Sequence, residues 1–389
     1  MLSAVRTAIG RFGGALAGMS AVDLSARAGR AALEAAGLAP GSIDEVILSN
    51  ARQAGVGPNP GRAVVPLVGL GESVTGSTIN MACGSGLKAV TMAWDAIGNG
   101  GADAMLVIGA EAMSQIPYLL PGARWGYRLG HGEVVDALHK DGFICALTNQ
   151  HMGMTAERLA SEYGITRAQS DEYAAESQAR AAAAQAAGHF ESQIVPVDIP
   201  QRRGPAVQFK QDEHPRPDTT VDALSRLKPV FKEDGIVTAG SASGITDGAA
   251  AAVFVAGEVA RAHGLKPLLR LHSWGAAGVD PNMMGIGPVP STQKALERGG
   301  LPIEALDLIE INEAFAPQVL ACQRDLGYDP AKANVDGGAI ALGHPIGMTG
   351  LRLLVALAHG LPRVDGRYGL ATLCINGGMG MSVIVERAG

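Results

Sequence analysis

The sequence predicts an α/β protein made of two similar halves with mostly parallel, buried sheets. In the first half, an apolar strand-like run ends at Asn80 and is followed by Cys83, a helical pattern and the strand-like AMLVIGA. In the second half, a run that ends near Val335 is followed by His344, a helical pattern and the strand-like YGLATLC, which ends on Cys374. The repeated order indicates a duplicated unit, and it predicts that Cys83 and His344 occupy matching places.

Both helical patterns carry their apolar residues on one face. The first has Leu87, Val90, Trp94 and Ile97, and the second has Leu351, Leu354, Val355 and Ala358. Cys83 and His344 directly precede these patterns, so we expect both side chains at helix N-termini. A helix N-terminus presents free N–H groups and a partial positive charge, which favour a thiolate and can hold a thioester oxygen.

An insertion of different composition separates the two halves. We expect an N-terminal half at residues 1–114 and 244–267, a loop domain at residues 115–243 and a C-terminal half at residues 268–389. The clearest element of the insertion is a helix from about 167 to 187, with Thr166 as N-cap, Gln169 completing a capping box and Gly188 after its end.

Composition narrows the functional class. The chain has 389 residues, 47% of them hydrophobic, which is ample for more than one core. Four cysteines make no disulfide framework, no Cys/His spacing indicates a metal, and no cofactor is expected. A net charge of −6 argues against nucleic acid as a partner, and without an apolar signal or membrane-spanning run we predict a cytoplasmic enzyme.

One stretch of the chain has a net positive charge, opposite in sign to that of the whole protein. Residues 201–232 contain seven basic residues, Arg202, Arg203, Lys210, Arg216, Arg226, Lys228 and Lys232, against four acidic ones. An ordinary solvated loop explains this charge equally well. Because proline and glycine are frequent there, we expect a loop that is suited to cover a long anionic ligand.

The cysteines differ in their surroundings. A lone cysteine is most often a small buried hydrophobe, and Cys145 and Cys322 fit that description. Cys83 does not, because a structural thiol gives no reason for CGSG between a strand and a helix. His344 alone could be a capping histidine, since HP often opens a helix. Its occurrence with Cys83 and Cys374 favours a base in acyl transfer through a thiolate.

The chain resembles the thiolase family in an ordered set of segments over nearly its full length: VRTAIGRFGG, NMACGSGLKAV, YLLPGARWGYRLG, HMGMTAE, DEHPRP, AGSASGITDGAAA, INEAF and GGAIALGHPIG. The resemblance implies duplicated βαβαβαββ halves that form a five-layered αβαβα core with an inserted loop domain. It also implies reversible condensation of two acetyl-CoA to acetoacetyl-CoA, or thiolysis of 3-ketoacyl-CoA, in a homodimer or homotetramer. Its substrates would be acyl-CoA and coenzyme A.

The resemblance also implies a role for individual residues. Cys83 would take the acyl group, His344 would accept its proton, and Cys374 would exchange a proton with the second substrate. Asn312 would hold a water beside His344 that binds the thioester oxygen. The backbone N–H groups of Cys83 and Asn376 would form the other oxyanion site. The coenzyme A and acyl pocket would be lined by Ser243, His151, Met152, Arg216, Met284 and Phe315.

Two other classes share features with this pattern. A ketoacyl-ACP synthase has an acylated cysteine but would be expected to carry an HGTGT-like motif and no second catalytic cysteine. A non-catalytic acyl-CoA-binding protein of the same fold would be expected to have lost a reactive group. The chain has GHPIG in place of an HGTGT-like motif, it has the second cysteine Cys374, and it retains Cys83 and His344, so neither class fits the sequence.

Two departures from the family pattern lead to expectations of their own. The family usually has a short apolar strand before SAVRT, whereas Ser3 follows Met1 and Leu2 directly, so the first strand is expected to be shortened. Asn376 stands where the family usually has glycine, which predicts a left-handed or otherwise unusual backbone there. RWGYRLG resembles a tetramerising loop, and short acyl chains are the expected substrates.

Overall fold

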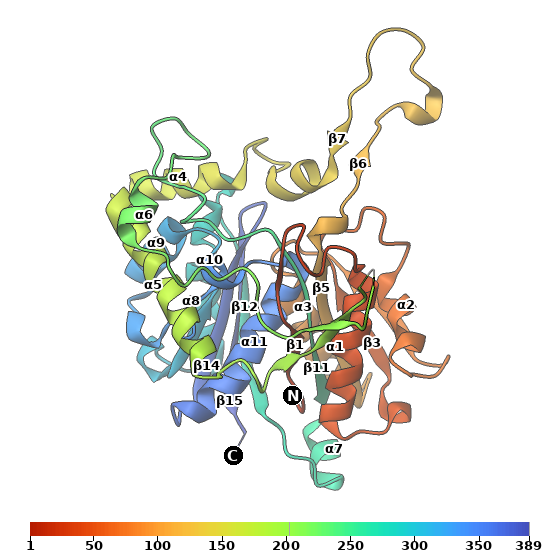
Figure 1. The fold of residues 1–389 in the computed structure, drawn as a ribbon. Coiled ribbons are helices and arrows are strands. Elements are labelled where there is room, and N and C mark those ends of the chain that lie inside the picture. The colour runs from red at the N-terminus through yellow and green to blue at the C-terminus, as the bar shows by residue number, and fades with distance from the viewer. Residues whose placement is uncertain (202, 389) are drawn as a thin grey trace.

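The computed structural model describes residues 1–201 and 203–388. Its strands are β1 (Val5–Thr7), β2 (Gly10–Arg11), β3 (Glu45–Ser49), β4 (Thr75–Ile79), β5 (Ala104–Ala112), β6 (Tyr118–Leu119), β7 (Val135–Asp136), β8 (Ile194–Val195), β9 (Val197–Ile199), β10 (Val207–Phe209), β11 (Thr246–Val255), β12 (Leu269–Gly278), β13 (Leu308–Ile311), β14 (Tyr368–Ile375) and β15 (Met379–Arg387). Its α-helices are α1 (Ala21–Ala36), α2 (Pro60–Leu67), α3 (Ser85–Gly98), α4 (Met152–Glu162), α5 (Arg167–Ala186), α6 (Val221–Ser225), α7 (Gly257–Ala262), α8 (Pro288–Gly299), α9 (Ala316–Leu326), α10 (Ala339–Leu342) and α11 (Ile346–Arg363). Figure 1 labels most of them.

Two sheets repeat one topology. The first has the order β4-β3-β5-β11-β1-β8, with β2 also paired to β11, and the second has the order β13-β14-β15-β12. In each sheet a parallel pair, β3 with β5 or β13 with β14, is followed by an antiparallel long strand, β11 or β15, and then by β1 or β12. The predicted duplication is therefore confirmed.

The second sheet lacks a full counterpart of β4. The sequence predicts a strand that ends near Val335, but the chain there makes only one parallel bridge, from Ala333 to Ile309. Asn334 follows with φ 45°, and its side-chain amide bonds both the N–H and the C=O of Ile311, at 3.0 and 2.9 Å. This side chain replaces the ladder bonds that a further strand residue would make, so the strand ends.

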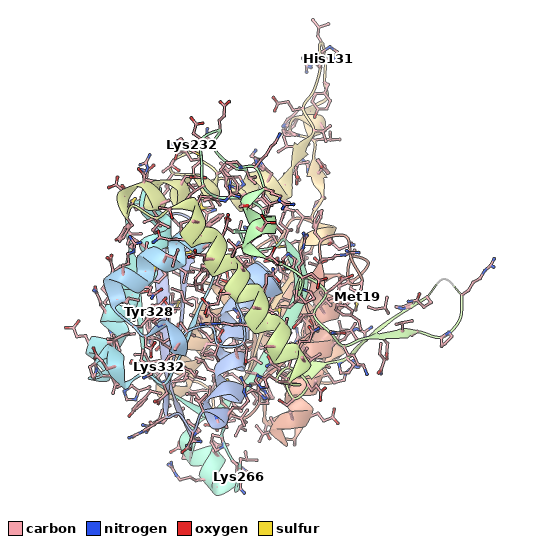
Figure 2. All side chains as sticks on the ribbon, turned by 60° about the vertical axis from the view of Figure 1, so that its left-hand side comes forward. Met19, His131, Lys232, Lys266, Tyr328 and Lys332 are labelled. Atoms are coloured by element: carbon pink, nitrogen blue, oxygen red, sulfur yellow. The ribbon has the colours of Figure 1, made fainter. Side chains whose placement is uncertain are left out.

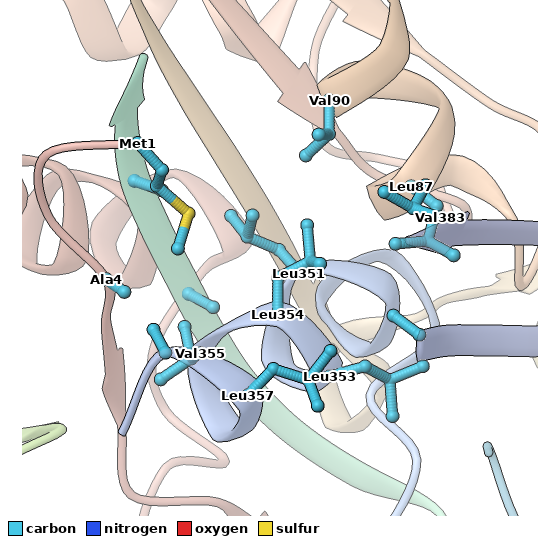
Figure 3. Packing of buried hydrophobic residues seen from close by; sticks show 14 of the residues in the cluster. Met1, Ala4, Leu87, Val90, Leu351, Leu353, Leu354, Val355, Leu357 and Val383 are labelled. Atoms are coloured by element: carbon cyan, nitrogen blue, oxygen red, sulfur yellow. The ribbon is translucent and has the colours of Figure 1, made fainter. Parts of the chain in front are cut away.

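Helices α3 and α11 lie between the two sheets and form the middle layer. The largest core cluster joins Leu87 and Val90 of α3 to Leu351 and Leu354 of α11 and to the inner faces of both sheets (Figure 3). A second cluster packs α1 and α2 on the outer face of the first sheet, and a third packs α8 and α9 on the outer face of the second. The result is the five-layered αβαβα core.

The two middle helices approach each other at a pair of glycines. A Cβ at Gly86 would lie 2.7 Å from the backbone nitrogen of Leu351, and one at Gly350 would lie 2.4 Å from that of Leu87. Only glycine allows this backbone contact. It brings the N-terminal ends of α3 and α11, and with them Cys83 and His344, to one place.

The segment between the halves contributes α4, α5, α6 and short strands, and its β8 joins the first sheet beside β1. The predicted helix is confirmed as α5, with the Thr166 and Gln169 capping box in place. In the basic stretch, β10 and α6 form within the predicted loop, and Arg202 lies outside the described residues. The division into domains stays a prediction, although β11 returns to the first sheet directly after this segment.

A narrow arm, residues 118–136 from β6 to β7, projects from the body of the molecule, as Figure 1 shows. Figure 2 places His131 at its tip. The two strands pair through Tyr118 with Asp136 and Leu119 with Val135. Among the described helices, none has the length and apolar character needed to cross a membrane.

Candidate active site

A cavity of about 470 Å³ opens between the two halves and the inserted segment. Of the residues predicted from the sequence, its wall contains Cys83, His344, Cys374, Asn376, Ser243, His151, Met152, Met284 and Phe315. The structure therefore brings together residues that lie up to 293 positions apart, counted from Cys83 to Asn376.

Cys83 lies just before α3, whose N-cap is Gly84, as the sequence predicts. The preceding residue, Ala82, has φ 47°, a left-handed conformation that is costly for a residue with a Cβ. The Ser85 hydroxyl holds this turn closed, because it donates to the Ala82 carbonyl at 2.7 Å and accepts from the Met81 N–H at 2.8 Å. The sharp turn directs the half-buried thiol into the cavity.

Several groups act on the Cys83 thiol in opposite directions. Burial raises its pKa, and the carboxylate of Glu111 acts in the same direction. The positive charge of Arg52 and the backbone N–H groups of Asn376 and of Cys83 itself lower the pKa. The two N–H groups predicted to form an oxyanion site are thus the ones that face this sulfur.

His344 precedes Pro345, the N-cap of α11, and its side chain is buried. Its Nδ1 lies 2.6 Å from the Thr349 hydroxyl, which itself donates to the Pro345 carbonyl at 3.0 Å. Because that hydroxyl has one proton, it accepts from His344, so Nδ1 carries the ring proton and Nε2 carries the lone pair, which faces Asn312 Nδ2 at 3.4 Å. Burial, followed by the charges of Arg352 and Arg52, lowers the pKa of His344 to about 3. The imidazole is therefore neutral in the resting protein, with Nε2 unprotonated.

Asn312 lies behind His344 rather than in the cavity wall. Its Nδ2 is 3.4 Å from His344 Nε2, and its buried Oδ1 has no hydrogen-bond partner among the described residues. A buried amide oxygen without a partner is a place where a water molecule binds. This fits the water that the resemblance to thiolases implies beside Asn312.

Cys374 is the penultimate residue of β14 and is fully buried apart from its cavity-facing side. Burial, followed by interaction with Cys83 and Cys322, raises its pKa well above the ordinary value. The side chain therefore stays a protonated thiol in the resting protein, and once deprotonated it is a strong base.

The left-handed backbone expected at Asn376 is not found. In the part of the chain that the structure describes, Ala82, Asn149, Asn334 and Asp365 are the non-glycine residues with positive φ. The left-handed residues of the turn between β14 and β15 are Gly377, with φ 92°, and Gly378, with φ 79°. Asparagine fits at 376 because the two glycines after it carry the strained conformations. Its Nδ2 donates to the Gly142 carbonyl at 3.2 Å.

Aromatic rings form a further part of the cavity wall. His151, the N-cap of α4, stacks on Phe231 with ring centroids 4.6 Å apart, and Phe231 meets Phe315 edge-on at 5.9 Å. His151 Nδ1 accepts the Gly153 N–H, and burial followed by the nearby His139 lowers its pKa. His151 is therefore neutral and presents Nε2–H as a donor to a ligand.

Arg216 does not line this cavity. Its backbone N–H donates to Gln178 Oε1 at 2.8 Å, and its carbonyl accepts from Thr219, so the residue is held in the turn that precedes α6. Its role in binding coenzyme A stays a prediction.

Comparisons with known proteins agree with this geometry. The model "Thiolase, N-terminal domain" matches residues 1–258, and the model "Thiolase, C-terminal domain" matches residues 265–387. The chain belongs to the thiolase family. The acetyl-CoA acetyltransferase of Escherichia coli K12 is 52% identical over 100% of this chain and 98% of its own length.

Two solved structures resemble this thiolase over its whole length. The acetyl-CoA acetyltransferase of Bacillus anthracis has a TM-score of 0.97 and 43% identity, and it covers 100% of this chain and 98% of its own. Human mitochondrial 3-ketoacyl-CoA thiolase in complex with CoA has a TM-score of 0.96 and 40% identity, with 100% and 97% covered.

Some residues of the site were not found from the sequence. Thr349 was missed although it lies one helical turn after Pro345, where it can reach the His344 ring. Phe231 and Arg52 lie outside any motif, and only the fold brings them to the cavity. Glu111, the penultimate residue of β5, was also missed.

Proposed function

We propose that the chain is an acetyl-CoA C-acetyltransferase that works through an acetyl-Cys83 intermediate. The observation that carries this proposal is that two thiols and one neutral imidazole open onto the same cavity, with two backbone N–H groups directed at one of the sulfurs. One nucleophile and a separate acid/base are what carbon–carbon bond formation between two thioesters needs.

In the first half-reaction, His344 Nε2 takes the Cys83 proton as the sulfur attacks the acetyl-CoA carbonyl. The N–H groups of Cys83 and Asn376 stabilise the oxyanion. The bond from the carbonyl carbon to the coenzyme A sulfur breaks, and Cys374 gives its proton to the leaving thiolate. The products are acetyl-Cys83, free coenzyme A, a Cys374 thiolate and a His344 imidazolium.

In the second half-reaction, the Cys374 thiolate takes an α-proton from a second acetyl-CoA. The water beside Asn312 and the imidazolium of His344 stabilise the enolate oxygen. The α-carbon attacks the acetyl group, the bond to the Cys83 sulfur breaks, and His344 returns the proton to that sulfur. Acetoacetyl-CoA leaves, and all groups are restored.

The reverse reaction, thiolysis of 3-ketoacyl-CoA, uses the same groups. We expect short acyl chains, because Met152, Met284 and Phe315 are buried against one another in the cavity wall. Initial rates over a series of 3-ketoacyl-CoA chain lengths test this. Acetoacetyl-CoA should be cleaved with the highest kcat/KM, and a preference for chains of eight or more carbons would contradict the proposal.

The alternative of a condensing enzyme that uses a carrier protein has its own test. Free coenzyme A should compete with acetyl-CoA and should remove the acetyl group from Cys83. An acetyl group that coenzyme A leaves in place, but an acyl-carrier protein removes, would favour the alternative. The expected cytoplasmic location remains a prediction.

The arm supports a tetramer as the oligomeric state. Six of its large apolar side chains are exposed, among them Trp125 at 82% and Leu129 at 98%, and exposed apolar patches of this kind mark contacts between chains. A Trp125→Ser, Leu129→Ser double variant should elute as a smaller species in size-exclusion chromatography with light scattering. Val207→Ser, an exposed residue outside the arm, is the control. An unchanged mass for the double variant would rule out an arm-mediated tetramer.

A further inference from the structure

Arg52 is a buried cation in the cavity wall that no motif indicates. It follows β3 by three residues and is only 5% exposed. Its Nη2 donates to the Gly142 carbonyl at 2.9 Å, and its Nη1 makes a long contact of 3.4 Å with the Ala51 carbonyl. Among the described residues, Nε has no hydrogen-bond partner, and no carboxylate lies within 4 Å of the guanidinium.

A buried guanidinium without a paired carboxylate costs several kcal/mol in desolvation. The carboxylate that compensates it in part belongs to Glu111, whose oxygens already accept from Asn50 Nδ2 and from the N–H groups of Ala51, Arg52 and Gly347. The part of the Arg52 positive charge that Glu111 does not compensate acts on the cavity, where it favours negatively charged groups. Because burying the Arg52 charge beside the cavity costs free energy, its presence there indicates that the charge has a function in the site.

The ionisable groups around Cys83 come from several elements. They are Arg52 after β3, Glu111 in β5, His344 before α11, Cys374 in β14, and, further along the cavity wall, Asp136, His139 and His151. Burial lowers the pKa of His344 and of His151, which keeps both imidazoles neutral, and the carboxylate of Glu111 opposes a thiolate. Arg52 is therefore the permanent positive charge next to the sulfur.

Arg52 also fixes the backbone on the other side of the sulfur. The Gly142 carbonyl accepts from Arg52 and from Asn376 Nδ2, so one oxygen joins the first half to the turn between β14 and β15. The fit is close, because a Cβ at Gly142 would lie 2.8 Å from Arg52 Nε. The backbone N–H of Asn376, which faces the Cys83 sulfur, is thus held in part through this contact.

We propose that Arg52 is a positioning residue for Cys83, whose fixed charge favours the thiolate and whose contact with Gly142 holds the Asn376 N–H toward the sulfur. The proposal rests on Cys83 as the reactive thiol. It assigns the Arg52 charge to the formation of the nucleophile and not to the binding of substrate.

The test is the pH dependence of Cys83 alkylation by iodoacetamide, followed by peptide mapping in the full-length protein. Arg52→Gln keeps a donor for Gly142 without the charge, and Arg52→Lys keeps the charge. The midpoint for Arg52→Gln should rise by about one pH unit, with alkylation near pH 7 about tenfold slower, since loss of a nearby opposite charge shifts a pKa by about that much. Arg52→Lys should recover most of the shift.

A matched control is Arg62→Met. The Arg62 guanidinium also donates to backbone carbonyls, those of Val74 and Glu72, and Arg62 lies outside the cavity wall. In Arg62→Met, the pH midpoint of Cys83 alkylation should equal that of the wild type. If Arg52→Gln does not fold, Arg52→Met replaces it with the same expectation. An unchanged midpoint in the neutral variant, or equal shifts for Arg52→Lys and Arg52→Gln, overturns the proposal.

This measurement needs no acyl-CoA, so it is independent of the proposed reaction. If acetyl-CoA fails to acylate Cys83 but the alkylation midpoint still depends on the charge at position 52, the proposed function fails and the role of Arg52 stands. If acetyl-CoA acylates Cys83 but the alkylation midpoint does not depend on the charge at position 52, the proposed function stands and the role of Arg52 fails. As a second readout, kcat at pH 7 should fall in Arg52→Gln, while KM for acetyl-CoA stays within about twofold.

Discussion

The state of His344 depends on a single hydroxyl, and Thr349→Val removes it. In the wild type the Thr349 oxygen accepts from Nδ1 at 2.6 Å, which leaves Nε2 unprotonated, as it must be to take the Cys83 proton. Valine has nearly the same volume but no acceptor. The ring then either keeps an unpaired buried N–H, at a cost of about 1–3 kcal/mol, or moves its proton to Nε2, where it blocks proton transfer from Cys83.

A cost of about 1–3 kcal/mol corresponds to a rate loss of about 5- to 150-fold at 25 °C. The assay is the initial rate of acetoacetyl-CoA thiolysis at saturating substrate, together with the rate of Cys83 acetylation. Both should fall by the same factor, and Thr349→Ser should restore most of the rate. KM should change little, since Thr349 lies behind the ring and not in the cavity wall.

Thr91→Val is the matched control. Thr91 is also buried in a middle helix, and its hydroxyl also bonds a carbonyl of the preceding turn, that of Lys88 at 3.0 Å, but it contacts no group of the site. A comparable small loss of stability with full activity is expected. If Thr349→Val keeps the wild-type rate, the Thr349 hydroxyl does not set the His344 tautomer, and the reasoning is refuted.

Three further predictions concern single side chains. Cys374→Ala should still become acetylated at Cys83 but should lose condensation by at least about 10²-fold, and full condensation activity would exclude Cys374 as the acid/base. Asn376→Ala removes the bond to Gly142 but keeps the N–H, so turnover should stay within about one order of magnitude; a loss of 10³-fold would show that the side chain itself takes part. Because the pKa of His344 is about 3 in the folded protein and near 6.5 in the unfolded chain, the unfolded state binds the extra proton, and this group lowers stability as pH falls from 6.5 toward 3. Chemical denaturation across that range should therefore show wild type losing more stability than His344→Gln, and parallel curves would contradict it.

Much of the fold could be predicted from local patterns. The repeat of strand, helix and strand around Cys83 and His344 gave the duplication, and the capping box gave the start of α5. The missing strand near Val335 could not be predicted, because it depends on a side-chain bond from Asn334 to a strand that is distant in sequence. Local apolar character does not contain that information.

In the site, too, local motifs could be predicted from the sequence, whereas contacts between distant residues could not. The glycine motifs predicted three residues that the structure brings to one cavity, Cys83, His344 and Cys374, because close backbone approach and helix N-termini leave a local signature. The left-handed backbone predicted at Asn376 was wrong, since the two following glycines carry the positive φ values. Arg52 and Thr349 gave no signal because their effect arises from neighbours that only the folded chain supplies.

The central claim is that Cys83 carries the acyl group. Incubation with acetyl-CoA, rapid acid quench and intact mass measurement with peptide mapping test it most directly. One acetyl group should appear on the peptide that contains Cys83, should be lost on addition of coenzyme A, and should be absent from Cys83→Ser. Acetylation at Cys374 or Cys145, or turnover without any acetylated cysteine, would contradict the claim.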